Sequence, residues 1–376
     1  MSAKRSVTKK KPSAAVASPE MLLDEVRHLI VEARQGTAQA VNAGLTLLYW
    51  QVGDRIRREI LKEKRAEYGA EILQTLSAKL EVEFGRGFAE KNLRRMVQFA
   101  EVFSDRSIVV SLIRQLTWTH FIVLIPLKDP LQRDFYAEMC RIEKWGTRTL
   151  RDRIASMLYE RTALSKRPKR LIEQELKTLR EEDRLTPDLI FRDPYVLDFL
   201  GLKDLYSEKD LENALLREIE SFLLELGNGF AFVERQKRIT LDGDDYYLDL
   251  LFYHRRLCRL IAVELKLGDF KPADTGQMEL YLRWLDRQER QKGEEKPLGL
   301  ILCAGKKHET VEVLELEPRG IHVAEYLTAL PPRELLQKRL HDAIIRSRLR
   351  LSEQQADDAP AKPVMMRKKR GTKNDF

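Results

Sequence analysis

Three charged residues stand on two neighbouring apolar runs in the second half of the chain. Asp249 lies in the run 247–253, and Glu264 and Lys266 lie in the run 260–266. Both runs are typical of β-strands, and because side chains along a strand alternate between faces, Glu264 and Lys266 project from the same side. Burying an ion is costly unless it is paired or holds a metal. The spacing predicts a divalent-cation site with an adjacent lysine, while a plain Asp249–Lys266 ion pair is the alternative.

The residue types suit one kind of chemistry. A hard cation such as Mg²⁺ prefers oxygen ligands and takes one or two carboxylates together with waters and a substrate phosphate oxygen. Asp249 and Glu264 meet that requirement, with Mn²⁺ as an alternative ion. A bound metal lowers the pKa of a water and stabilises charge on a phosphate, and Lys266 adds a positive charge that orients the hydroxide. We therefore expect metal-dependent hydrolysis of phosphodiester bonds.

The segment that precedes these strands is predicted to be a helix from Ser207 to the glycines 227–229. Glu212 lies on its apolar stripe and faces the interior, which makes it a third candidate metal ligand. A carboxylate stabilised by the dipole at the start of a helix is the alternative for Glu212.

A loop and a further helix are expected after Lys266. Gln277 and Tyr281 are four residues apart, so they share a helix face and can point back at the sheet edge. The continuous apolar run 298–304 predicts a strand buried on both faces. The expected order is helix, two hairpin-like strands, helix and strand.

The order Glu212, Asp249, Glu264-Leu265-Lys266 and Gln277 resembles the PD-(D/E)xK nuclease superfamily, and within it the YhcG family. This resemblance spans about residues 20 to 345. It implies a restriction-endonuclease-like α/β domain with a central mixed sheet, in which Asp249 and Glu264 bind the metal, Lys266 positions or activates the attacking water and Gln277 completes the catalytic set. The motif's proline is absent, because Leu248 precedes Asp249. The segments that carry the YhcG resemblance are 222–227, 229–233, 235–236, 249–254, 264–266 and 276–282.

Composition limits the class of protein. A chain of 376 residues with 43% hydrophobic content is long enough for two packed domains, and a net charge of +8 favours an acidic partner such as nucleic acid. The three cysteines have no metal-ligand or disulfide spacing, which fits a reducing cytoplasm, and the YhcG resemblance implies a bacterial protein. No apolar run is long enough for a membrane span, and the N-terminus lacks the apolar core of a secretory signal.

The first half of the chain is predicted to be helical, with helices over 21–34, 37–62 and 70–84. The glycines of 85–87 then form a turn before another helix, as in a helix-turn-helix. The YhcG resemblance implies a helical domain of winged-helix type. An ordinary solvated helix face is the alternative to DNA contact. The candidate DNA-contacting residues on the second helix are Lys91, Asn92, Arg94, Arg95 and Gln98.

The predicted organisation therefore has a helical N-terminal domain followed by an α/β nuclease domain, with polar and basic ends that favour disorder. Its parts are a disordered basic arm at 1–19, a helical domain predicted to contact DNA at 20–161, a charged linker at 162–193, the nuclease domain at 194–351 with a closing helix at 331–351, and a disordered basic tail at 352–376.

Together these features predict a Mg²⁺-dependent deoxyribonuclease that acts in DNA repair, recombination or mobile-element defence. A DNA-binding or assembly protein with a catalytically silent nuclease fold is one alternative, which the presence of Asp249, Glu264 and Lys266 argues against. An RNA-directed nuclease is the other. Because two active sites related by a two-fold axis match the two strands of a duplex, a homodimer is a further hypothesis.

Overall fold

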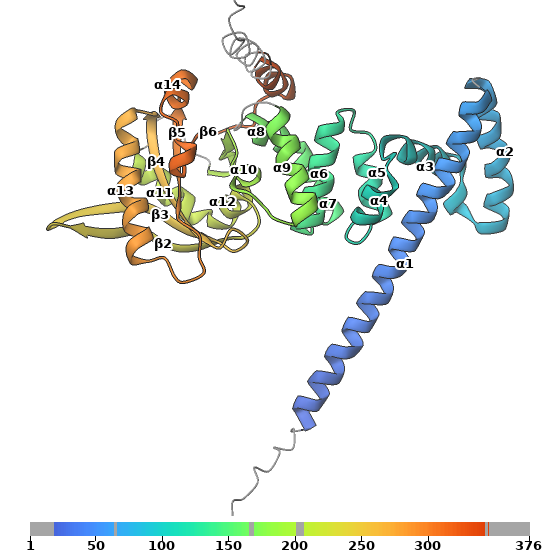
Figure 1. Ribbon diagram of the computed structural model, residues 1–376, viewed down its shortest axis with the longest axis horizontal. Helices are drawn as coiled ribbons and strands as arrows, with labels where there is room; N and C mark the ends of the chain where they lie inside the picture. Colours follow the sequence, from blue (N-terminus) through green and yellow to red (C-terminus); the bar gives the residue numbers. More distant parts are fainter. Residues whose placement is uncertain (1–18, 64–65, 165–168, 201–206, 343–344, 346–376) are drawn as a thin grey trace, which may run out of the picture. The chain divides into compact units, whose positions relative to one another are not determined.

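The computed structural model describes residues 19–63, 66–164, 169–200, 207–342 and 345 (Figure 1). The predicted basic tail and all but Pro19 of the predicted basic arm lie outside these residues, as does most of 343–351 in the predicted closing helix. That helix is present over 333–342. The chain divides into two compact units, Met1–Arg133 and Asp134–Phe376. None of the described helices combines the length and apolar content needed to cross a bilayer.

The described part of the first unit is built from helices, and it contains no strands that would form a wing. The sequence predicted two helices over 21–34 and 37–62, but the structure has one helix of 45 residues through Gly36. An interior glycine costs about 1 kcal/mol but keeps its N–H, so it weakens a helix without ending it. The elements are α1 (Pro19–Glu63), α2 (Ala66–Phe84), η1 (Arg86–Phe88), α3 (Glu90–Val102), α4 (Arg106–Leu112) and α5 (Trp118–Leu124).

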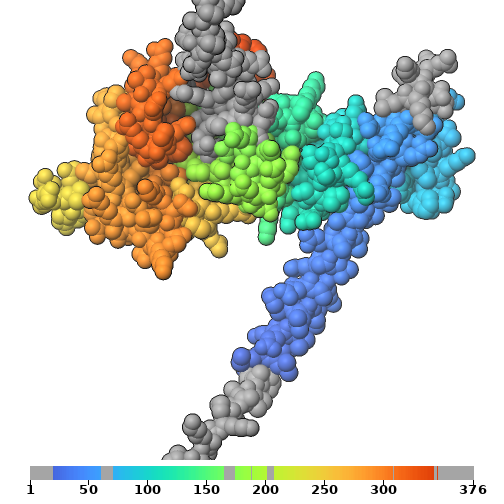
Figure 2. Space-filling model, in the orientation of Figure 1, coloured from blue at the N-terminus to red at the C-terminus, as the bar shows by residue number. Residues whose placement is uncertain are grey.

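The second half of α1 packs closely against α3, because a glycine on α1 leaves room for the α3 backbone. A Cβ atom at Gly53 would lie 1.8 Å from the Met96 carbonyl oxygen. Leu93 and Met96 are fully buried there, against Ile56 and Leu73. The first half of α1 has no such packing and appears in Figure 2 as a bare rod.

The second unit begins with helices and continues into a mixed sheet. The predicted linker 162–193 forms α9 and α10 here, and Leu176 and Leu179 of α9 are buried. The helices are α6 (Pro130–Glu143), α7 (Thr147–Ala155), α8 (Leu158–Leu164), α9 (Lys169–Glu182) and α10 (Pro187–Ile190).

Six strands form the sheet in the order β1-β6-β5-β4-β3-β2 (Figure 1). The pairs β1–β6, β6–β5 and β5–β4 are parallel, and the pairs β4–β3 and β3–β2 are antiparallel, so the predicted central mixed sheet is confirmed. The three predicted apolar runs lie in β3, β4 and β5. The strands are β1 (Tyr195–Val196), β2 (Phe230–Leu241), β3 (Asp244–His254), β4 (Arg259–Asp269), β5 (Leu298–Gly305) and β6 (Ile321–Leu327).

Helices cover both faces of this sheet. Tyr281 of α13 (Pro272–Gln288) packs in one core with Leu251 of β3. Phe252, which points to the opposite face, meets the Phe222 ring of α12 (Ile219–Leu226) edge to face with centroids 5.9 Å apart. The predicted helix over 207–226 is in fact two, α11 (Glu208–Arg217) and α12, because Glu218 takes φ −106° and ψ 33°. The shorter elements α14 (His308–Val313) and η3 (Glu317–Arg319) precede β6.

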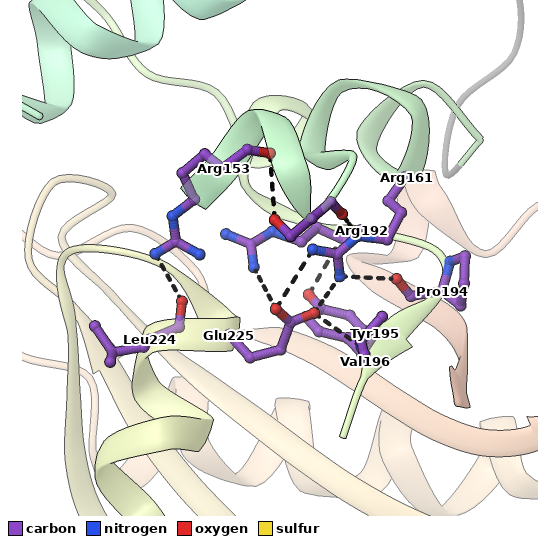
Figure 3. A network of polar contacts seen from close by, with 9 residues as sticks. Arg153, Arg161, Arg192, Pro194, Tyr195, Val196, Leu224 and Glu225 are labelled. Carbon is purple, nitrogen blue, oxygen red and sulfur yellow. Dashed lines mark hydrogen bonds and ion pairs between the residues drawn. The ribbon is translucent and has the colours of Figure 1, made fainter. Parts of the chain in front are cut away.

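A buried ion network ties α7 and α8 to the sheet (Figure 3). The Glu225 carboxylate pairs with the fully buried guanidinium of Arg161 and, at 3.4 Å, with that of Arg192, and it accepts a hydrogen bond from the Val196 N–H at 2.9 Å. Arg153 donates to the Leu224 carbonyl at 2.8 Å. Burial lowers the pKa of Arg192 to about 10, against the opposing charge of Glu225. The helices α7 and α8 are therefore structural parts of the same unit as the sheet.

Candidate active site and candidate DNA-contacting helix

Strand register brings the two predicted carboxylates together. The β3–β4 ladder runs from His254↔Arg259 to Leu250↔Val263, and one further step places Asp249 opposite Glu264. The backbone pairing stops there, and the Leu265 N–H donates instead to Asp249 Oδ2 at 2.8 Å. The Asp249 carboxylate thus accepts a backbone hydrogen bond that a β3 carbonyl would accept in a continuous ladder, at the point where the two strands separate.

Glu264 is a buried carboxylate with one oxygen satisfied and one not. Its side chain accepts a hydrogen bond at Oε1 from Lys266 Nζ at 3.0 Å. Oε2 is buried without a hydrogen-bond partner among the described residues. Burial, and then the charge of Asp249, raise the pKa of Glu264 to about 7. This shared face for Glu264 and Lys266 is the one that strand alternation predicted.

Burial and neighbouring charges also shift the pKa values of Asp249 and Lys266. Burial raises the pKa of Asp249, and the nearby charge of Glu212 adds to the effect. Burial disfavours the charged form of Lys266, but the Glu264 carboxylate, together with the charges of Glu208 and Asp249, raises the Lys266 pKa overall. A nearby cation would stabilise the ionised forms of these two carboxylates and would satisfy the Oε2 oxygen of Glu264. Asp249 and Glu264 therefore fit a divalent metal. When bound, such an ion would supply Lewis-acid activation of a water.

Glu212 approaches this pair through an amide. Gln236 Nε2 donates to Glu212 Oε2 at 2.8 Å and to Asp249 Oδ1 at 3.1 Å. Among the described residues there is no group of three or more His, Cys, Asp or Glu side chains placed to hold one metal. Two carboxylates are within the number that Mg²⁺ takes from a protein, with waters completing its shell.

Gln236 is a site residue that sequence reasoning missed. It lies on β2, where the register against β3 places it opposite Asp249, and its φ of +47° falls in the left-handed region that few residues other than glycine adopt. The sequence did contain a signal for Gln236, because Arg235-Gln236 is one of the segments that carry the YhcG resemblance.

Gln277 lies at the sheet edge and bonds within its own helix. Its Nε2 donates to the Tyr281 hydroxyl at 2.5 Å, which in turn donates to the Tyr247 carbonyl at 3.0 Å. The predicted shared face is therefore confirmed. Burial, with smaller contributions from the charges of Glu264 and Asp249, raises the pKa of Tyr281 to about 12, so the phenol stays protonated as a donor.

The candidate DNA-contacting residues lie on α3 in the other unit. Gly85, with a φ of +86°, follows the end of α2 and begins the predicted turn. Lys91, Arg94 and Gln98 are exposed, and Asn92 and Arg95 are half-buried.

Two of these cations are held by their own helix. Arg94 is paired with Glu90 at 2.5 Å, and Arg95 donates to the Asn92 side chain at 3.4 Å. Any phosphate contact by Arg94 would therefore compete with Glu90.

Two family models match this sequence. A family model described as the YhcG PDDEXK nuclease domain matches residues 188–341, and one described as the DUF1016 N-terminal domain matches residues 25–161. The chain belongs to the YhcG family of PD-(D/E)xK nucleases. A relative in Escherichia coli (strain K12), named "Putative nuclease YhcG", is 35% identical over 371 residues, which cover 90% of this chain and 96% of that protein.

Two solved structures are similar over a third of the chain. A repair endonuclease from Pyrococcus abyssi has a TM-score of 0.24 and 17% identity, covering 35% of this chain and 50% of its own. EndoMS in complex with double-stranded DNA has a TM-score of 0.25 and 19% identity, covering 35% and 49%.

Proposed function

We propose that this protein is a Mg²⁺-dependent deoxyribonuclease that hydrolyses phosphodiester bonds, with Mn²⁺ as an alternative ion. Its proposed active site consists of Asp249, Glu264 and Lys266. The observation that carries the proposal is the buried Oε2 of Glu264, which has no hydrogen-bond partner in the described part of the chain and lies beside Asp249, at the point where β3 and β4 separate. A buried acceptor without a donor is costly, and a cation would satisfy it.

The surrounding residues have distinct roles in this proposal. Lys266 has a raised pKa and stays protonated near neutral pH, so it acts as a fixed positive charge that orients the nucleophile rather than as a general base. Gln236 holds Asp249 in place and links it to Glu212. Tyr281 borders the site, where its protonated hydroxyl is held between the Gln277 amide and the Tyr247 carbonyl.

DNA is the proposed substrate. The net charge of +8 favours a polyanionic partner, and α3 presents Lys91, Arg94 and Gln98 to solvent. DNA repair, recombination or mobile-element defence is the proposed setting. A homodimer is proposed because two active sites suit the two strands of a duplex.

The test uses three variants, Asp249→Asn, Glu264→Gln and Lys266→Ala. Each is expected to abolish cleavage while folding and DNA affinity stay close to wild type, because each removes a group at the cation site without removing the basic surface. The matched control is Asp245→Asn, which makes the same change on the same strand, at an exposed pair with Arg238.

Cleavage is measured on duplex, branched and single-stranded DNA and on RNA, with and without Mg²⁺. Wild-type rates in any two of the three variants would refute the site. Cleavage of RNA alone would replace DNA as the substrate, and no cleavage of any substrate would favour a silent nuclease fold.

A further inference from the structure

One amide group lies between two carboxylates at the candidate active site. Gln236 Nε2 donates to Glu212 Oε2 at 2.8 Å and to Asp249 Oδ1 at 3.1 Å, with one N–H for each acceptor. Glu212 is buried, and like charges this close repel unless a donor or a cation lies between them. The amide nitrogen therefore occupies the place that a cation shared by the two carboxylates would take.

Backbone and side chain both hold this amide in position. Gln236 has a φ of +47°, and such a conformation in a residue other than glycine persists where the surrounding structure imposes it, often at functional sites. Its two acceptors are carboxylates, and hydrogen bonds to ionised groups are stronger than those between neutral groups. Mg²⁺ for its part gives up its waters reluctantly. An incoming cation would thus have to displace a firmly held donor.

The other carboxylate oxygens suit one cation. Asp249 Oδ2 accepts a hydrogen bond from a backbone N–H at 2.8 Å, and Glu264 Oε1 accepts one from Lys266 at 3.0 Å. Glu264 Oε2 is buried and has no hydrogen-bond partner within the described ranges of the chain. A cation at this oxygen beside Asp249 would satisfy it. A second cation would need the Glu212 oxygen that Gln236 already holds.

We propose that Gln236 is a positioning residue that limits the active site to one divalent cation, because its amide holds Glu212 and Asp249 where a second cation would bind. The inference rests on the proposed function, since it assumes the cation site at Asp249 and Glu264. In two-metal sites the ions lie about 3.5 to 4 Å apart. Asp249, which lies beside both positions, would then be the ligand that the two ions share.

Counting the Mn²⁺ ions bound by the full, DNA-free chain tests this limit. Electron paramagnetic resonance at about pH 8, where carboxylate ligands are ionised, measures free Mn²⁺ and distinguishes an isolated bound ion from a magnetically coupled pair. Wild type is expected to bind one isolated ion per chain. Gln236→Gly is expected to bind a coupled pair, because glycine adopts the left-handed backbone without strain and lacks the amide.

Further variants locate the second ion and control for the backbone. Gln236→Glu replaces the amide with a carboxylate of the same size and is also expected to bind two ions. Adding Glu212→Ala to Gln236→Gly is expected to restore one ion. Asp242→Gly is the matched control, because Asp242 has a left-handed backbone at φ +53° but is exposed after the end of β2, about 20 Å along the strand. This control is expected to bind one ion, like wild type.

The possible failures of this inference and of the proposed function differ in the number of ions. A coupled pair in wild type, or one ion in either folded Gln236 variant, overturns the limit and leaves the cation site in place. Two ions in the double variant, or in Asp242→Gly, also overturn it, because the second ion would then not depend on Glu212 or on the Gln236 amide. No bound ion in wild type removes the cation site of the proposed function itself, and this inference with it.

Discussion

The raised pKa of Glu264 makes stability and metal binding depend on pH in a defined direction. In the metal-free protein, burial and the charge of Asp249 move this pKa from 4.5 to about 7. The protonated form therefore stabilises the fold, fully below about pH 4.5, and this contribution is lost as pH rises through 7. At 1.36 kcal/mol per pH unit, the difference amounts to roughly 3 kcal/mol.

A cation that binds the ionised carboxylate competes with this proton. With a pKa of about 7, the ionised fraction of Glu264 falls from about nine-tenths at pH 8 to about one-tenth at pH 6, so the apparent metal affinity is expected to weaken about tenfold. The raised pKa of Asp249 acts in the same direction. At about pH 6, binding is expected to release close to one proton from Glu264.

Calorimetric titration of Ca²⁺ or Mg²⁺ into DNA-free protein, in buffers of different ionisation enthalpy, measures both quantities. Denaturation of metal-free wild type and Glu264→Gln across the same pH range isolates the stability change, because the variant cannot ionise. An affinity that is equal at about pH 6 and about pH 8, with no proton released at the lower pH, would refute the assignment of Glu264 as a metal-binding carboxylate.

Three further substitutions test other parts of the chain. Replacing Arg94 and Arg95 with Ala is expected to weaken DNA binding and lower its salt slope by about one for each phosphate that is no longer bound, and an unchanged isotherm from low to high salt would place DNA recognition elsewhere. Glu225→Ala leaves buried guanidinium groups uncompensated and is expected to cost about 3 to 5 kcal/mol in denaturant unfolding, whereas a decrease below about 1 kcal/mol would show that the network relaxes. Gly53→Ala, whose new Cβ would lie 1.8 Å from a backbone oxygen of α3, is expected to lower the melting temperature, while Gly44→Ala, with nothing within 4 Å, is expected to keep or raise it; equal melting temperatures would contradict the close packing.

Periodicity along the chain was enough to place several features correctly. Strand alternation predicted that Glu264 and Lys266 share a face, and their side chains bond at 3.0 Å. Helical spacing predicted that Gln277 and Tyr281 meet, which they do at 2.5 Å. These contacts depend on the fixed geometry of a single element, so neighbouring residues determine them.

Local signals were less reliable for the limits of helices. Two helices were expected over 21–34 and 37–62, but one helix runs through both ranges and includes Gly36. The expected helix over 207–226 breaks at Glu218, where no glycine or proline stands. Packing by distant parts of the chain can override the modest local preferences of single residues.

The site itself needed the tertiary structure. The register of three strands puts Gln236, Asp249 and Glu264 side by side, and a left-handed backbone at Gln236 aims its amide between two carboxylates. Likewise, Arg161 meets Glu225 across 64 residues of chain, which makes the end of the first family domain part of the nuclease unit. Strand register, bulges and long-range ion pairs depend on which segments meet in space, and that choice is made by the packing of the whole core rather than by any one segment.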